Sequence, residues 1–153
     1  VIKVELPVDA HLPHDYVPEE RLRLEAYRRL ANARTQADVL GVVEELADRY
    51  GSLPTPVETL VSIASLRVAL QAVGITEVIA TATHVKFSPV ELVESRILRL
   101  NRLYPGSVIK PATRTIVVPR NNNDSVIGAV AKSADIDLVE WVNTWVASVV
   151  AAP

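Results

Sequence analysis

Apolar and polar residues alternate along the first positions of the chain. The segment VIKVEL has apolar residues at positions 2, 4 and 6 and charged residues at 3 and 5, a period of two that predicts a half-buried strand. The following PVDAHLPHDYVP contains three prolines, which exclude a continuous helix or a central strand. We therefore expect an ordered, extended arm after the strand.

The pattern then changes to a helical period in two successive segments. The first segment runs from Pro18 to about Ala33, and its expected apolar face consists of Leu24, Tyr27, Leu30 and Ala31. The second segment begins after Thr35, and Asp38 completes a short capping box. It ends at Gly51, which we expect to be a C′ residue in the left-handed conformation. Its predicted apolar stripe consists of Val39, Val42, Val43, Leu46 and Tyr50.

A third helix is predicted from Thr55, as N-cap, to Gly74, with Pro56 at its first position. Apolar residues leave it only a narrow polar face, so we expect it at the centre of the domain with Leu66 enclosed. We expect no apolar run to reach the roughly 18–20 residues of a membrane span.

The second half of the chain mixes short strands with helices. We expect a hairpin at 77–80 and 83–87, a helix opened by Ser88 and ending near Leu103, strands at 108–110 and 115–118, a loop at 121–124 and a closing helix from Asp135. The predicted class is α+β: a strand followed by a three-helix cluster, then a small antiparallel sheet with two further helices. We expect one domain over residues 1–153, excised from a longer protein.

Composition excludes several classes of protein. The 153 residues are 49% hydrophobic and carry a net charge of −2, which argues against disorder and against a general polyanion-binding surface. The absence of cysteine excludes thiolate catalysis and cysteine-ligated zinc. No glycine-rich phosphate loop or nucleophile motif occurs, so we expect no catalytic residue and no bound cofactor.

Two clusters of functional side chains have ordinary explanations. His11 and His14, flanked by Asp9 and Asp15, provide metal-type ligands but not the three fixed ligands typical of catalytic zinc, so we expect a solvated loop and no metal site. In the predicted fourth helix, Arg96, Arg99 and Arg102 recur every three residues. We expect a solvated face paired with Glu91 and Glu94, although contact with phosphate or an acidic partner is the functional alternative.

The end of the second predicted helix breaks local charge rules. Glu44, Glu45 and Asp48 crowd one turn near the helix C-terminus, where neither their mutual repulsion nor the helix dipole is favourable. Arg49 offsets the repulsion only in part, through its spacing from Glu45. Such a breach is expected at functional sites, and an arginine-bearing partner would relieve it; a plain solvated acidic face is the alternative.

Sequence motifs suggest a family. LPxDYVP, RLxxYRRLAxA followed by Thr, and ELxDRYGxLPxP occur in order over about residues 5–80, before a long apolar helix and a closing GI. In this order and spacing they resemble the C-terminal domain of the bacterial transcription-repair coupling factor. Residues 81–153 resemble that family in pattern only.

The resemblance implies a regulatory function within a larger protein. Members of the family are cytoplasmic, ATP-dependent translocases of double-stranded DNA that displace stalled RNA polymerase and recruit UvrA. ATP and Mg are bound outside this last domain, which packs on a UvrB-like N-terminal module, hides the UvrA-binding surface and restrains the motor. By motif match, the interface would include Glu45, Asp48 and Arg49, with Glu44 beside them. The alternative hypothesis is a small independent metal- or nucleic-acid-binding module.

Overall fold

The computed structural model describes residues 2–120 and 134–151, and the loop predicted at 121–124 lies outside them. The described strands form one five-stranded sheet in the order β1-β2-β3-β5-β4. Its strands are β1 (Lys3–Glu5), β2 (Glu77–Ala80), β3 (His84–Ser88), β4 (Val108–Lys110) and β5 (Thr115–Pro119). The α+β prediction is confirmed. The sheet is mixed rather than purely antiparallel, because β1 pairs in parallel with β2 while all other neighbours are antiparallel.

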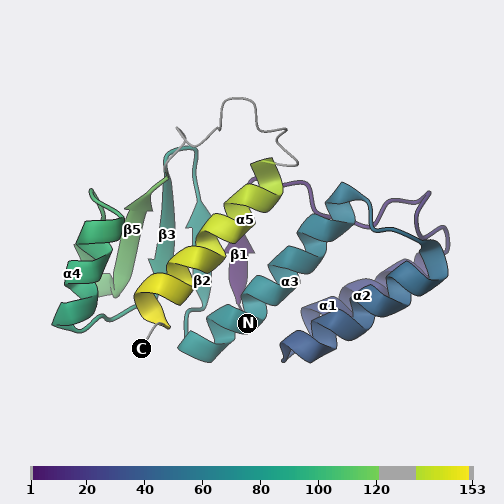
Figure 1. Cartoon of the computed structure of the whole chain (residues 1–153), viewed down its shortest axis with the longest axis horizontal. Coiled ribbons are helices and arrows are strands. Elements are labelled where there is room, and N and C mark those ends of the chain that lie inside the picture. Colours follow the sequence, from purple (N-terminus) through teal and green to yellow (C-terminus); the bar gives the residue numbers. More distant parts are fainter. Residues whose placement is uncertain (1, 121–133, 152–153) are drawn as a thin grey trace.

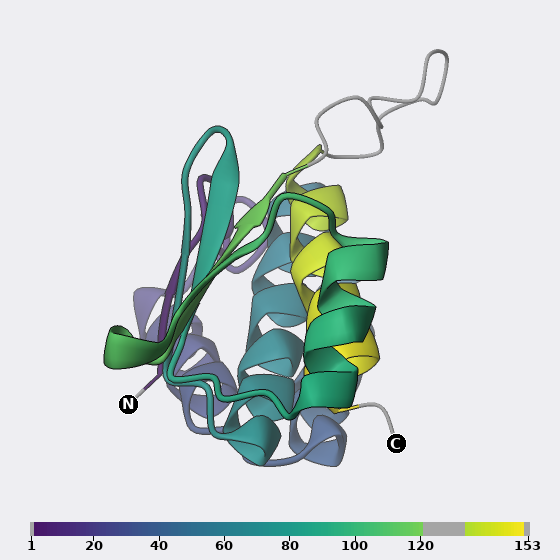
Figure 2. The same cartoon turned by 90° about the vertical axis from the view of Figure 1, so that its left-hand side faces the viewer.

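Helices lie on one face of this sheet and beyond one of its edges. They are α1 (Glu20–Ala31), α2 (Gln36–Tyr50), α3 (Thr55–Val73), α4 (Glu94–Leu103), the short 3₁₀ turn η1 (Pro111–Thr113), α5 (Ala134–Trp145) and its π-helical continuation η3 (Val146–Val150). α1 and α2 lie at one end of the long axis and α4 at the other, with α3 and α5 between them (Figure 1). Seen edge-on, the sheet has α3 and α5 on the same side (Figure 2).

Helix α3 belongs to both hydrophobic cores. Ile63, Leu66 and Leu70 pack in a cluster with the sheet and α5, which we call the sheet core. Val57 and Ala64 pack in a second cluster with α1, α2 and the N-terminal arm, the helix core. Leu66 is 1% exposed, as predicted. An almost uniformly apolar helix is needed here because both of its sides are covered.

The apolar face of α1 differs from the predicted one. Leu30 is buried and Tyr27 packs on the helix core, as predicted. Leu24 is 52% exposed and Ala31 is also exposed, whereas Ala26, which the prediction left out, is buried. The buried face follows the row 22, 26 and 30, and Leu24 lies about 200° around the helix from Leu22. Because positions 22 and 24 are both leucine, the helical period alone does not show which of the two faces of α1 is buried.

The predicted helix ends are partly confirmed. Thr35 and Asp38 form the capping box of α2, and the pKa of the Asp38 carboxyl is lowered because it accepts from the backbone N–H groups of Arg34 and then Thr35. Gly74 ends α3 in the left-handed region. Gly51 has φ 90° but ψ −165°, so its backbone is a glycine conformation other than left-handed helix. The N-cap of α3 is Pro54, not Thr55, since the Pro54 carbonyl accepts the first helical bonds.

Helix α4 begins later than predicted. Ser88 is the last residue of β3 and pairs with Glu77, so it cannot cap a helix. After the cis Ser88–Pro89 bond, the Val90 N–H donates to the Arg114 carbonyl. The chain therefore stays extended up to Val93, which is the N-cap of α4.

Helix α5 closes the sheet core, as predicted. Trp145 is fully buried and stacks on Phe87 of β3, with ring centroids 3.8 Å apart. One turn earlier, Trp141 meets Tyr104 edge to face at 5.7 Å. The spacing of four residues places both indoles against the same core.

The expectation that no apolar segment is long enough to span a membrane is wrong. By length and composition alone, α3 could cross a membrane, because its few polar residues are small or well separated. A core helix passes the same test, and α3 contacts α1, α2 and α5 along its length.

Candidate functional site

The acidic turn consists of Glu44, Glu45, Asp48 and Arg49 on the last turns of α2. Val42 and Leu46 turn inward to the helix core, so the residues between and after them face outward. All four members of the acidic turn are exposed. The placement follows directly from the helical period, and the charges gather at the helix end where the dipole disfavours anions.

Glu45 has a partner that the sequence analysis did not identify. The guanidinium of Arg29 on α1 donates to Glu45 Oε2 at 2.7 Å. The expectation that only Arg49 and water relieve the repulsion is therefore wrong for Glu45, because α1 and α2 pack against each other and place Arg29 across from it. Both side chains are well exposed, so this pair contributes little to stability.

Asp48 remains without an ion pair among the described residues. The same holds for Glu44 and Arg49 within residues 2–120 and 134–151. Two carboxylates one helical turn apart thus stay available to a ligand outside the chain. Carboxylates in this state accept charge-assisted hydrogen bonds from guanidinium groups, in favourable geometry as bidentate pairs.

The acidic turn is anchored from below by Tyr16 of the proline-rich arm. Its hydroxyl lies 2.8 Å from the Gly51 carbonyl oxygen and 3.3 Å from that of Leu46, and donates its single proton to this pair of acceptors. Its ring contacts Tyr50 at 5.7 Å. Burial, and secondarily Tyr50, raises the pKa of Tyr16. The arm therefore holds the last turn of α2 in place. The tyrosine responsible, Tyr16, belongs to the DYVP motif of the sequence.

The histidine cluster has local partners. His11 Nδ1 lies 2.7 Å from Asp9 Oδ1, and the Asp9 backbone N–H donates to the Asp135 carboxylate. His14 and Asp15 are exposed on the arm. Across the two described stretches, no three His, Cys, Asp or Glu side chains come together in a way that could hold a metal ion.

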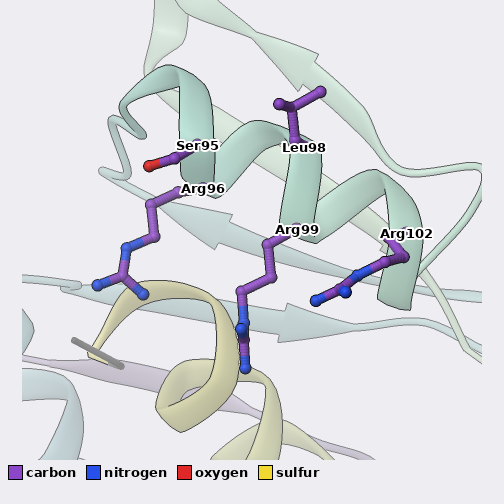
Figure 3. Close-up of a pocket in the computed structure, with 5 residues that line it drawn as sticks. All are labelled: Ser95, Arg96, Leu98, Arg99 and Arg102. Carbon is purple, nitrogen blue, oxygen red and sulfur yellow. The ribbon is translucent and has the colours of Figure 1, made fainter.

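The arginine row of Arg96, Arg99 and Arg102 is not paired as expected. Glu91 binds Arg114 instead, at 2.8 Å. The segment before α4 meets the residue between η1 and β5, where the Val90 N–H donates to the Arg114 carbonyl. Arg96 and Arg99 donate to the carbonyl oxygens of Val149 and Ser148 in η3. With Ser95 and Leu98, the three arginines line a hollow of about 360 Å³ (Figure 3).

Comparisons with known proteins agree with this fold. A family model described as "TRCF domain" matches residues 6–97. The chain is 42% identical over 153 residues to the transcription-repair-coupling factor of Mycobacterium bovis, a match that covers 99% of this chain and 12% of that protein. It is 42% identical over 73 residues to the factor of Escherichia coli, covering 48% of this chain and 6% of that protein.

A solved structure shares the architecture. The crystal structure of a C-terminal domain of transcription-repair coupling factor superposes with a TM-score of 0.76 at 18% identity, over 97% of this chain and 91% of that one. This likeness shows the fold. The mycobacterial match also extends through the second half of the chain, where the sequence motifs had indicated a resemblance in pattern only.

Proposed function

Because the chain belongs to the TRCF domain family, we propose that it is the non-catalytic regulatory domain of an ATP-dependent DNA translocase that couples nucleotide-excision repair to transcription. The chain spans 12% of the length of its mycobacterial relatives. In this proposal the ATP and Mg sites, the contacts with double-stranded DNA and those with RNA polymerase lie in other parts of a cytoplasmic parent protein. This domain binds no cofactor.

The proposed regulation is autoinhibition by an intramolecular contact. The acidic turn packs on a UvrB-like N-terminal module of the parent protein, masks the UvrA-binding surface and restrains the motor. The observation that supports it is that Asp48 has no ion-pair partner in the described part of the chain and lies on an exposed helix end where negative charge is unfavourable. Arginines on the partner module would relieve this repulsion.

The ion pair between Arg29 and Glu45 changes how much each residue of the acidic turn can contribute to the proposed interface. Glu45 already binds Arg29, so a partner arginine must share or replace that bond. Asp48 has no such competitor among the described residues and forms the stronger new contact. Losing one member of a desolvated interface pair costs about 2–5 kcal/mol, largely because the other charge stays buried alone. A closed state favoured by only a few kcal/mol would then open substantially.

The test is Asp48→Asn in the full-length parent protein. The substitution keeps the shape of the side chain and removes its charge. We expect stronger UvrA binding and higher basal ATP hydrolysis, because the closed state is weakened. Glu140→Gln is the matched control, since Glu140 is an exposed carboxylate on α5, away from the acidic turn. It should change neither readout.

Folding of the domain is measured in parallel. Asp48→Asn in the 153-residue chain should leave thermal stability unchanged or slightly higher, because a repulsive charge is removed from a helix C-terminus. Unchanged UvrA binding in a stable variant would contradict the interface. A marked loss of stability would show that Asp48 serves the fold instead.

A further inference from the structure

The arginine row is a second charged surface, far from the acidic turn. Helix α4 lies at the opposite end of the long axis from α1 and α2 (Figure 1). The guanidiniums of Arg96 and Arg99 extend from α4 toward the C-terminal helix, and that of Arg102 points toward Arg99 (Figure 3). Within the described parts of the chain, none of the three forms an ion pair, and Glu91, one of the two acids expected to pair with them, is bound to Arg114.

Two of the arginines are held in position. Arg96 Nη1 donates to the Val149 carbonyl and Arg99 Nε to the Ser148 carbonyl, so the end of η3 orients both side chains and partly neutralises them through its dipole. Each guanidinium has five N–H donors, and the hydrogen bonds to η3 use one of them in each of the two arginines that line the hollow. Arg102 is exposed and makes no hydrogen bond to a described residue. The hollow is thus preorganised for an anion.

Apolar side chains adjoin the arginines. Leu98 is 65% exposed and Leu103 is 43% exposed on α4. Leu98 lies one helical turn before Arg102, and Leu103 one turn after Arg99, so each leucine neighbours an arginine on the helix surface. Leu98 lines the hollow of the arginine row. Leu103 lines a second hollow beside Trp141 and Ser148, so a ligand must extend over both hollows to cover both leucines.

We propose that the arginine row, with Leu98 and Leu103, is a docking site for an acidic segment of a protein partner that also carries apolar side chains. Carboxylates bind the guanidiniums, and apolar side chains cover the leucines. A nucleic-acid backbone fits less well, because the row has no exposed aromatic residue for base stacking and the chain has a net charge of −2. This site is independent of the proposed autoinhibitory contact.

The test measures binding of defined probes to the 153-residue chain. A fluorescent peptide of repeated Asp-Glu-Leu is compared with a peptide of repeated Asp-Glu-Ser of equal charge and with a short DNA duplex. We expect the leucine-containing peptide to bind most tightly. Its affinity should fall as salt is raised, since exposed charges are screened.

Two variants assign the binding to this surface. Arg102→Glu should weaken the leucine-containing peptide by about tenfold or more, and folding is preserved because Arg102 holds no carbonyl of η3. Arg21→Glu, an equal charge change at an exposed position of α1, should have an effect below about twofold. Leu98→Ser should weaken the leucine-containing peptide but not the serine peptide.

Three results would overturn the proposal. One is the absence of measurable binding to the leucine-containing peptide. Another is an equal loss in Arg102→Glu and Arg21→Glu, which would show attraction by overall charge alone. The third is tighter binding of the duplex with the same dependence on Arg102, which would make the row a nucleic-acid contact.

Discussion

Tyr16 shows how a single side chain connects distant segments of this protein. It lies in the proline-rich arm, yet its hydroxyl binds the carbonyl groups at the end of α2, 30 and 35 residues later. Leu12 and Val17 are buried beside it in the helix core. The arm is therefore a structural support for the acidic turn. Contrary to the expectation from the sequence, it is not extended throughout, because residues 14–16 form a turn in which the Tyr16 and Val17 N–H groups donate to the Pro13 carbonyl.

The raised pKa of Tyr16 predicts a pH dependence of stability. Its folded pKa lies above the unfolded value because of burial and Tyr50. The stability it contributes is thus fully present below about pH 10 and is lost as the pH rises through the folded pKa. Tyr16→Phe should cost about 1 kcal/mol at pH 8, and the difference from the parent chain should shrink above pH 10.

Urea unfolding at several pH values measures this effect. Tyr104→Phe is the control for the loss of a hydroxyl, because the Tyr104 hydroxyl makes no hydrogen bond to any residue in the described stretches. A difference between Tyr16→Phe and the parent chain that stayed constant up to strongly alkaline pH would contradict the assignment.

Among the elements, those with complete local signals begin where the sequence indicates. Thr35 and Asp38 supply both halves of a capping box, and α2 begins at Gln36. Ser88 carries a similar signal before Pro89, but β3 incorporates it into the sheet through its pairing with Glu77. A cap contributes about 1 kcal/mol, which several ladder bonds and the burial of Phe87 exceed.

Thr35→Ala tests the capping box. The variant removes the hydroxyl that accepts from the Asp38 N–H, so the free energy of unfolding should fall by about 1 kcal/mol. Chemical denaturation followed by circular dichroism gives this value. Ser52→Ala, at an exposed loop position, is the control and should lie within about 0.5 kcal/mol of the parent. An unchanged midpoint for Thr35→Ala would mean that solvent replaces the cap without cost.

At the scale of the whole molecule, α3 makes two cores into one structure. It contributes Leu66 and Leu70 to the sheet core and Val57 and Ala64 to the helix core. If α3 left either core, apolar surface of the other core would be exposed as well. The acidic turn and the arginine row therefore belong to opposite ends of a body joined by one buried helix.

We expect unfolding to be a single cooperative transition. Trp141 and Trp145 both report on the sheet core, whereas circular dichroism also records α1 and α2 of the helix core. The two denaturation curves should coincide, because α3 is shared. Leu46→Ala in the helix core should shift both curves together by about 2–5 kcal/mol. Separate midpoints would show that the helix core unfolds independently.

The positions of most elements and the outward direction of the acidic turn follow from local sequence patterns alone. Period, caps and glycine terminators act within a few residues, so the α+β class, α2 and the hairpin followed from them. The register of α1 and the start of α4 did not, because packing and strand pairing outweigh such weak local preferences.

Which charges are paired depends instead on how the helices pack. Arg29 reaches Glu45 across 16 positions of sequence, and Arg96 and Arg99 reach carbonyls about 50 positions away. These contacts depend on how α1 lies on α2 and how α4 lies beside η3, which no local pattern encodes. The physical reason is that an ion pair depends on the distance between atoms in space, while periodicity records only neighbours along the chain.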